Sequence, residues 1–480
     1  MALGQVDYGL YGVVGGLAAF ISFINGLFST AVGRFYAVEV GRASVAADKK
    51  AAVEECRKWF STAVFVHLLL PTVLMAIGYP LGDWVVRNFL EMPSDRVNDC
   101  VWVFRFVCIS CYLGMVAVPF SAMYTAKQYI AELTVYSFAT TTLNAAFLYY
   151  MVTHPGVWLA KYALWMCAMS VLPTAIIAIR ACFLFPECRF SPRYCASKQR
   201  FRELLYFVGW WAFGQTGGML RNQGIQILIN KYFGATTNAA MTIQTSVTGH
   251  AMMLSSAMNQ AFQPAIVNAF GAGEFDRMRA LAYRACKFSM LLALVFMLPL
   301  GLEFEEILRI WLVNPPKYVY GLCLIAFVMT IIDQSAVGHM LAVNACGKIA
   351  KYQIFLGGAL LLTLPLAWVF CYIGLNVYFV GLALLLTMTY CAWGRVWFAR
   401  SLVGMSARYW LVRVLLPVLL LIAVCLAIGI VPRICLPSGL LRIFITTSVC
   451  ELTFLPLAWF VILSAREREY ISSRVLKCLR

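Results

Sequence analysis

Long, nearly uninterrupted apolar stretches recur along the whole chain, and they constrain its fold more than any other feature. Most are about 20 residues long or longer, the length that a helix needs to cross a hydrocarbon core of roughly 30 Å. Transmembrane β-strands would instead be short and alternating. With 62% hydrophobic and 12% charged residues, a soluble chain of 480 residues could not bury so much apolar surface. The sequence therefore predicts an all-α polytopic membrane protein.

Thirteen segments have the length and composition of membrane spans, and the short connections between them leave no room for a large extramembrane domain. The approximate ranges are 8–33, 59–86, 100–124, 129–152, 157–181, 203–229, 238–266, 282–302, 317–341, 351–373, 376–398, 411–431 and 443–463.

The basic residues indicate which side of the membrane each connection occupies. If the 34–58 loop is cytoplasmic and every span crosses, 28 Lys and Arg residues lie on the cytoplasmic side and 8 on the other. The positive-inside rule produces this asymmetry. We expect the N-terminus of the chain outside and its C-terminus in the cytoplasm. The net charge of +17 follows mostly from this bias, so we expect anionic membrane lipids as partners and no nucleic acid.

The chain repeats itself weakly at an offset of 230 residues. Ungapped identities pair Gly4 with Gly234, Ala31 with Ala261, Gly41 with Gly271 and Cys56 with Cys286. At this offset the span at 8–33 falls on the span at 238–266, and both have the same expected orientation. We therefore predict two parallel, pseudo-repeated helical bundles around a central cleft, an arrangement typical of transporters.

The repeat and the charge pattern together predict four segments. They are a first bundle at 1–182, a basic cytoplasmic linker at 183–202, a second bundle at 203–400, and two extra transmembrane helices with a basic tail at 401–480.

Motifs for bound metals, nucleotides and redox chemistry are not found in the sequence. The 17 cysteines are scattered, mostly within spans, without zinc-site spacing. Cys108 and Cys111 form a C-x-x-C inside a span, where packing is their expected role. Because there is no phosphate-binding loop of the G-x-x-x-x-G-K-[ST] kind, energy would come from an ion gradient or from consumption of product. We expect no metal and no cofactor.

Two groups of residues resemble a known family. The opening Asp7-Tyr8-Gly9-Leu10-Tyr11-Gly12 and the later Arg34-Phe35, Glu39 and Gly41 are similar to the second-helix region of bacterial polysaccharide flippases. The second half continues the pattern with Asn222-Gln223-Gly224, Asn230, Phe233-Gly234, Asn238-Ala239-Ala240, Gln263-Pro264, Gly271, Asp333 and Gly347-Lys348. Over roughly residues 4–400 the chain resembles the O-antigen and capsule repeat-unit translocases of the multidrug/oligosaccharidyl-lipid/polysaccharide (MOP) exporter superfamily.

That resemblance implies a function and a location. The cargo would be an undecaprenyl-pyrophosphate-linked oligosaccharide, flipped across the bacterial inner membrane by alternating access for O-antigen, lipopolysaccharide or other surface polysaccharide biosynthesis. Polysaccharide polymerase machinery would be a possible partner. The family has fourteen helices, one of them before the Asp7-Tyr8-Gly9 motif, so we expect a first helix to be missing here. The protein would be a transporter and not an enzyme.

Three alternatives remain open at this point. A drug/cation:ion antiporter of the same superfamily would favour buried carboxylates, whereas the acids within spans are few, chiefly Asp333 and Glu451. A membrane enzyme such as a polymerase would need a sizeable outer loop. A non-transporting paralogue is the third.

Arg221 is the leading candidate for a binding residue. Of 38 Lys and Arg residues, only Arg221 and Arg105 fall within long apolar stretches, where an ionisable group marks a functional site by default. At 100° per residue Arg221 shares a helix face with Gly214, Gly217 and Gly218. An adjacent stripe carries Gln215, Asn222 and Gln226. Either Arg221 presents its fork to cargo phosphate, or this face packs against another helix.

The other candidates are more dispersed along the sequence. As further cavity residues we name Asn25, Asn259, Arg105 and Arg34, which could instead bond across helices or anchor at headgroups. As coupling-ion candidates we name Asp333 and His250. For Asp333 the alternatives are pairing with an arginine or capping a broken helix, and for His250 a packing role.

Overall fold

The computed structural model describes residues 7, 10, 11, 14, 19–89, 93, 96–154, 156, 158–195, 197–312, 314–469 and 472–473. The part of the chain that it describes is helical nearly throughout and contains no strand. Eight helices there are long and apolar enough to cross a membrane, and one bent pair makes a possible ninth. The prediction of an all-α polytopic membrane protein is confirmed.

The predicted spans that fail this apolarity test are helical as well. They are 8–33, 129–152, 203–229 and 238–266, wherever the structure describes them. Their Thr, Asn, Gln and Gly residues lower the hydropathy below that of the other spans. Thirteen segments thus remain a reasonable count of the crossings.

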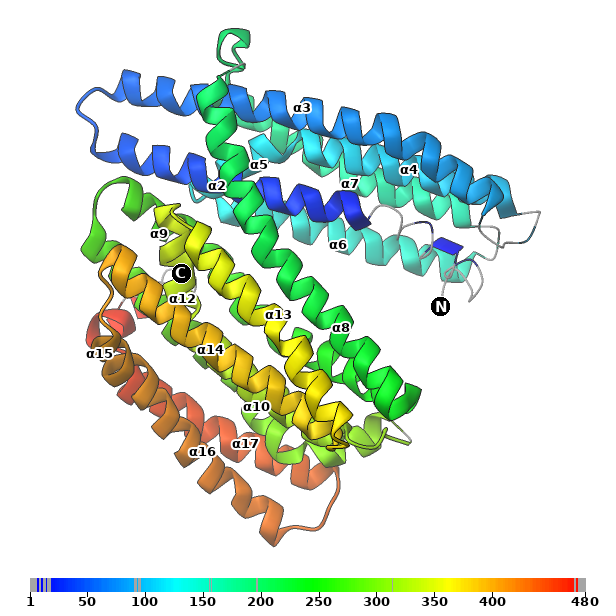
Figure 1. The fold of residues 1–480 in the computed structure, drawn as a ribbon, viewed down its shortest axis with the longest axis vertical. Coiled ribbons are helices and arrows are strands. Elements are labelled where there is room, and N and C mark those ends of the chain that lie inside the picture. Colours follow the sequence, from blue (N-terminus) through cyan, green and yellow to red (C-terminus); the bar gives the residue numbers. More distant parts are fainter. Residues whose placement is uncertain are drawn as a thin grey trace. The chain divides into compact units, whose positions relative to one another are not determined.

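The chain divides into two compact units (Figure 1). Unit 1 comprises Met1–Gly209 and Val267–Glu274, and unit 2 comprises Trp210–Ile266 and Phe275–Arg480. Unit 1 contains α2 (Ala19–Val45), α3 (Lys49–Asn88), α4 (Val97–Val116), α5 (Val118–Ala126), α6 (Ile130–Thr153), α7 (Leu159–Leu184), and the 3-10 turns η2 (Pro186–Cys188) and η3 (Pro192–Tyr194).

Helix α8 (Lys198–Ala251) begins in unit 1 and continues into unit 2, with non-helical backbone at Gly234. The following elements are α9 (Met253–Gly271), α10 (Phe275–Trp311), α11 (Val319–Ser335), α12 (Val337–Cys346), α13 (Ala350–Tyr372), α14 (Val377–Val403), α15 (Ala407–Trp410), η4 (Leu411–Leu415), α16 (Leu416–Cys435), α17 (Leu440–Leu457) and η5 (Ala458–Ile462).

The two halves repeat the same irregularities in the same order. A long helix is interrupted at Ala117, between α4 and α5, and again at Ala336, between α11 and α12. The short second piece ends each time near a residue in the left-handed region, Gln128 with φ 63° and Gly347 with φ 78°. An antiparallel pair follows in each half, α6 with α7 and α13 with α14. The element order therefore agrees with the predicted pseudo-repeat.

One helix contact within unit 1 also follows the predicted offset of 230 residues. A Cβ built on Gly41 of α2 would lie 2.1 Å from the carbonyl oxygen of Asn268, and one built on Gly271 of α9 would lie 2.2 Å from that of Val38. Positions 38 and 268 differ by 230, as do 41 and 271. The contact is therefore reciprocal, as pseudo-twofold symmetry requires, and both glycines permit a backbone approach that any side chain would block.

The segment predicted as a linker, 183–202, is folded against unit 1. The Ser191 amide donates to Ser61 Oγ of α3 at 3.1 Å, and Thr62 Oγ1 donates to the Tyr194 carbonyl at 3.0 Å. Lys127 pairs with the buried Glu187 carboxylate at 2.6 Å. Both the polar groups and the apolar side chains of this segment therefore have partners on the body of unit 1.

The two extra helices pack against α10 of unit 2, beside which Figure 1 shows them running antiparallel. Leu294, Leu298 and Leu302 of α10 share a buried cluster with Val418 and Phe454. After α17, Glu467 binds the buried ammonium group of Lys287 at 2.5 Å. Lys287, counted from the sequence among the cations of the cytoplasmic connections, is therefore a packing residue of this unit.

Candidate functional site

The glycines of α8 are packing residues. A Cβ on Gly217 would come within 3.0 Å of the Gly357 backbone in α13, and one on Gly214 within 1.9 Å of the Gln353 side chain. The small-residue contact, one of the two alternatives for this face, is present. Arg221 continues the same face and is only 9% exposed.

Arg221 has few partners for a buried guanidinium group. Its Nε and Nη2 atoms donate to Oδ1 of neighbouring Asn222 at 3.2 and 3.1 Å. Its Nη1 has no hydrogen-bond partner among the described residues. Asp333 and Arg395 lie within electrostatic range of it. A buried charged group normally has full hydrogen bonding, so Arg221 retains capacity to bind an anion.

Asp333 is already paired. Its Oδ1 accepts a hydrogen bond from Arg395 Nη1 at 2.8 Å, and its Oδ2 accepts one from Gln334 Nε2 at 2.9 Å. The pairing alternative for Asp333 is therefore the arrangement observed. A coupling cation could reach this carboxylate only after Arg395 had moved.

Arg395 is the functional candidate that the sequence analysis missed. It lies within α14 and is 7% exposed, whereas its position near a span end placed it among the cytoplasmic cations. One signal could have found it. A carboxylate within a span, such as Asp333, requires a nearby cation, and Arg395 is one of the few on the following helices.

The cluster forms where α11 is broken. The α11–α12 pair bends by 42°, which frees backbone carbonyl groups. Arg395 Nη1 donates to the Asp333 carbonyl at 3.2 Å, and Trp410 Nε1 donates to the Ser335 carbonyl at 2.7 Å. These side chains satisfy polar backbone groups that lipid could not satisfy. The Asp333 carboxylate does not itself cap the break.

Asn259 connects this cluster to neighbouring helices. Its Nδ2 donates to Gln334 Oε1 at 3.1 Å, and its Oδ1 accepts from Ser289 Oγ at 2.6 Å. The network therefore joins α9, α10, α11 and α14. Asn259 bonds across helices, which was its alternative role.

The described cluster has an excess of positive charge. Arg221 and Arg395 contribute two cations, and Asp333 contributes one anion. An uncompensated buried cation is costly in an apolar environment. The arrangement is therefore suited to an anionic group next to Arg221.

The remaining candidates do not join the cluster. On α8, Gln215, Asn222 and His250 are exposed and Gln226 is half-buried. In unit 1, Asn25 Oδ1 is buried without a described partner.

The two arginine candidates of unit 1 lie against aromatic rings. The Arg105 guanidinium group lies 5.0 Å from the Trp102 ring centroid. That of Arg34 lies 5.0 Å from the Phe35 ring and 5.1 Å from the Phe207 ring. No contact among Asn25, Arg105 and Arg34 is described.

Known families and structures are related to this chain at the level of the fold. The family model for MatE matches residues 219–369, a range that includes Arg221 and Asp333. No curated protein matches the sequence.

Solved structures match over most of the chain. A multidrug resistance MATE family transporter of the MOP superfamily in an outward-facing conformation has 14% identity and a TM-score of 0.65, covering 85% of this chain and 95% of that one. A MOP superfamily transporter from Pyrococcus furiosus, whose binding pocket is described as having reverse polarity, has 14% identity and a TM-score of 0.63, with 83% and 94% covered. A Vibrio cholerae MATE transporter has 14% identity and a TM-score of 0.63, with 82% and 91% covered.

These matches establish the fold. Unit 1 and unit 2 together have the architecture of the MOP superfamily, in the form seen in MATE transporters. The narrower resemblance to O-antigen flippases is not confirmed by them.

Proposed function

We propose that this protein is a transporter of the MOP type that moves an amphipathic substrate with an anionic head across the membrane by alternating access. The specific cargo that we propose is a lipid-linked oligosaccharide carrying a pyrophosphate. The buried guanidinium group of Arg221, with an unpartnered Nη1 beside a carboxylate that Arg395 already occupies, carries this proposal.

Charge is the physical argument. Arginine binds phosphate oxygens through two parallel hydrogen bonds, and a low dielectric strengthens each of them. Gln215, Asn222 and Gln226 on the same helix could donate to sugar hydroxyls, with Asn25, Arg105 and Arg34 of unit 1 as further candidates. A cationic drug would meet repulsion from Arg221 instead.

The second candidate is drug/cation:ion antiport, and the comparisons favour it. The solved structures that match include a multidrug resistance transporter with the same fold. Asp333 would become available to a cation if Arg395 moved away. The reverse polarity described for the Pyrococcus furiosus transporter supports the view that the fold tolerates binding sites of either sign.

One experiment separates the two candidates. The full gene product is expressed in a bacterial strain that lacks its O-antigen flippase and in a strain that lacks its drug exporters. We expect surface polysaccharide to be restored in the first strain and drug resistance to be unchanged in the second. Arg221→Gln should abolish the restoration at equal membrane levels, because a lost charge-assisted bond costs on the order of 1.5–3 kcal/mol.

Arg87→Gln is the matched control. Arg87 is exposed on α3 and pairs with Asp83 four residues earlier, so its loss should leave transport intact. Restored drug resistance without polysaccharide would establish the antiport alternative. Full polysaccharide with Arg221→Gln would refute the role of Arg221.

A further inference from the structure

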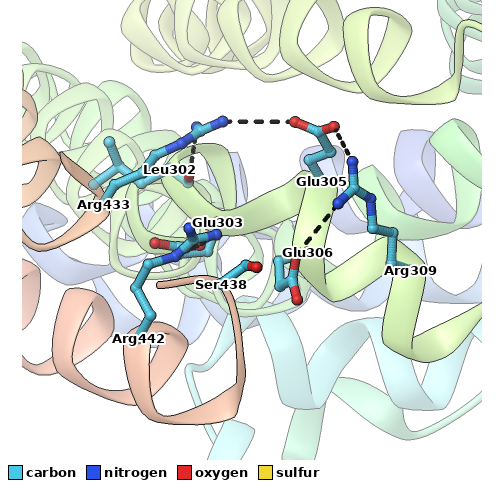
Figure 2. A pocket seen from close by; sticks show the side chains of 8 residues that line it. All are labelled: Leu302, Glu303, Glu305, Glu306, Arg309, Arg433, Ser438 and Arg442. Carbon is cyan, nitrogen blue, oxygen red and sulfur yellow. Dashed lines mark hydrogen bonds and ion pairs between the residues drawn. The ribbon is translucent and has the colours of Figure 1, made fainter. Parts of the chain in front are cut away.

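A polar cavity of about 170 Å³ lies where α10 ends and α16 turns into α17, and Figure 2 shows its lining. All three helices belong to candidate membrane spans that begin or end at this level. The cavity therefore lies near the boundary between lipid and water. Its walls carry three carboxylates and three guanidinium groups, contributed by Glu303, Glu305, Glu306, Arg309, Arg433 and Arg442.

The inner side of the cavity is closed by a complete ion pair. Arg442 donates from Nε and Nη2 to Glu303 Oε2 at 3.1 and 2.9 Å, and Thr446 Oγ1 donates to Oε1 at 2.9 Å. The Glu303 side chain is fully buried. This pair fastens α17 to α10 and leaves no acceptor on Glu303 for a ligand.

The outer rim is more loosely paired. Figure 2 shows Arg309 and Arg433 extending toward Glu305 from opposite sides, with N–O distances of 2.7 and 3.6 Å. Arg433 also donates to the Leu302 carbonyl at 2.6 Å. Rim pairs of this kind are half-exposed and contribute little to stability, so they can exchange partners at small cost.

Glu306 is the group that these contacts do not satisfy. Its carboxylate is only 15% exposed, and its one described partner is the exposed Arg309, 3.8 Å away. That distance is too long for a hydrogen bond. A largely buried carboxylate normally accepts several, so Glu306 offers strong acceptors to a cationic donor inside the cavity.

The opposite wall suits an anion. Ser438 lines the cavity directly before α17, whose N-cap residue Gly439 supplies no side-chain cap. The first amide groups of a helix without a cap are unpaired donors, and the helix dipole favours negative charge there. Arg433 and Arg442 add positive charge on the same side.

The flanks of the cavity are strongly apolar. Leu440, Leu441 and Phe444 of α17 are 71%, 70% and 71% exposed, and Ile434 of α16 is 76% exposed. Side chains of this kind next to a charged cavity fit the acyl chains of a lipid, whose polar headgroup would occupy the cavity.

We propose that this cavity is a binding site for a phospholipid whose headgroup carries both a phosphate and a primary ammonium group, of the phosphatidylethanolamine class. The ammonium group donates to Glu306, and the phosphate accepts from Ser438, the first turn of α17 and the rim arginines. A quaternary choline headgroup cannot donate a hydrogen bond to Glu306. A purely anionic headgroup leaves Glu306 unsatisfied. The site is independent of the transported cargo.

The test uses the purified full chain in detergent. Equimolar phosphatidylethanolamine and phosphatidylcholine with identical acyl chains are added, and the lipids retained are measured by native mass spectrometry. We expect phosphatidylethanolamine to be preferred roughly tenfold, the size of one hydrogen bond to a charged group. Glu306→Gln should reduce the ratio to about one, because an amide oxygen lacks the charge that binds ammonium.

Glu54→Gln is the matched control, because Glu54 also forms one loose ion pair, with Arg57 at 3.5 Å, but lies outside the cavity. It should leave the ratio unchanged. As a second variant, Ser438→Asp should lower retention of phosphatidylethanolamine by placing a negative charge beside the phosphate. Ser438 is exposed in a turn, so this variant should fold normally.

Three results would overturn the proposal. They are equal retention of the two lipids by the unaltered protein, a preference that survives Glu306→Gln, and stronger retention of anionic phosphatidylglycerol than of phosphatidylethanolamine. Displacement of bound lipid by soluble phosphoethanolamine as effectively as by a short-chain phosphatidylethanolamine would show that the acyl flank plays no part, and would equally refute a lipid site.

Discussion

The charge balance around Asp333 predicts that its two buried partners respond unequally to mutation. Asp333→Asn would leave Arg221 and Arg395 near one another without any described carboxylate between them, raising the net charge of the cluster from +1 to +2. Arg395→Gln would instead leave Arg221 and Asp333, with a net charge of zero. Removing one partner of a buried pair typically costs about 3–5 kcal/mol because the other charge is left uncompensated.

We therefore expect Asp333→Asn to show the full loss of stability and Arg395→Gln a clearly smaller one. In the second variant Arg221 can take over the carboxylate, and Gln334 continues to donate to Oδ2. The double variant Asp333→Asn/Arg395→Gln should be more stable than Asp333→Asn alone, because it returns the net charge to +1. Coupling of this sign is diagnostic of residues that interact directly.

The assay is the thermal unfolding midpoint of each purified variant in one detergent, together with its level in the membrane. Asp83→Asn is a suitable control, since it removes a carboxylate that pairs with Arg87 on the surface of α3. An Arg395→Gln variant that is as unstable as Asp333→Asn, or a double variant less stable than Asp333→Asn, would refute the charge argument.

Three further predictions concern other parts of the molecule. Gly41→Ala and Gly271→Ala should each lower the unfolding midpoint, because the new Cβ would overlap a backbone carbonyl, whereas Gly33→Ala has open space and should be neutral; equal effects would contradict the contact. A cysteine at Ser197, in a background without accessible native cysteines, should resist an impermeant maleimide in intact cells if the 183–202 segment is cytoplasmic; labelling would reverse the topology. Burial raises the pKa of Glu467, but hydrogen bonds from Lys287 and Ser464 outweigh it and hold the pKa below its usual 4.5. Docking of the C-terminal segment should therefore be fully stabilised above pH 4.5 and weaken as the pH falls through the lower folded-state pKa, a dependence that Glu467→Gln should remove in a proteolysis assay.

The fold was largely predictable because hydrophobic length and charge asymmetry are local properties of the sequence. The ends of the thirteen spans and the offset of 230 residues follow from composition and from a few glycines. Gly41 and Gly271 illustrate why the motif residues matter, since both occur at the close contact between α2 and α9. Their role is structural, so a motif of this kind identifies the superfamily without identifying the cargo.

The charge cluster was less predictable because it depends on which helix faces meet. Arg221 was found because it stands alone in an apolar stretch, but its closeness to Asp333 depends on how α8, α11 and α14 pack. Arg395 was missed because a cation a few residues inside a span end is usually interfacial, where its long side chain can reach water. Here the break between α11 and α12 provides a carboxylate and two free carbonyls at that depth.

The position of Arg395 also bears on how a transporter of this kind could couple two ligands. Because Asp333 can pair with either Arg395 or Arg221, an anion that binds Arg221 withdraws one competitor for the carboxylate and strengthens the pair with Arg395. A cation that binds Asp333 would release both arginines and raise the affinity of Arg221 for an anion. Reciprocal effects of this kind are a coupling free energy between two sites. An anionic cargo and a coupling cation would then favour each other's binding, whereas two cations would compete for Asp333.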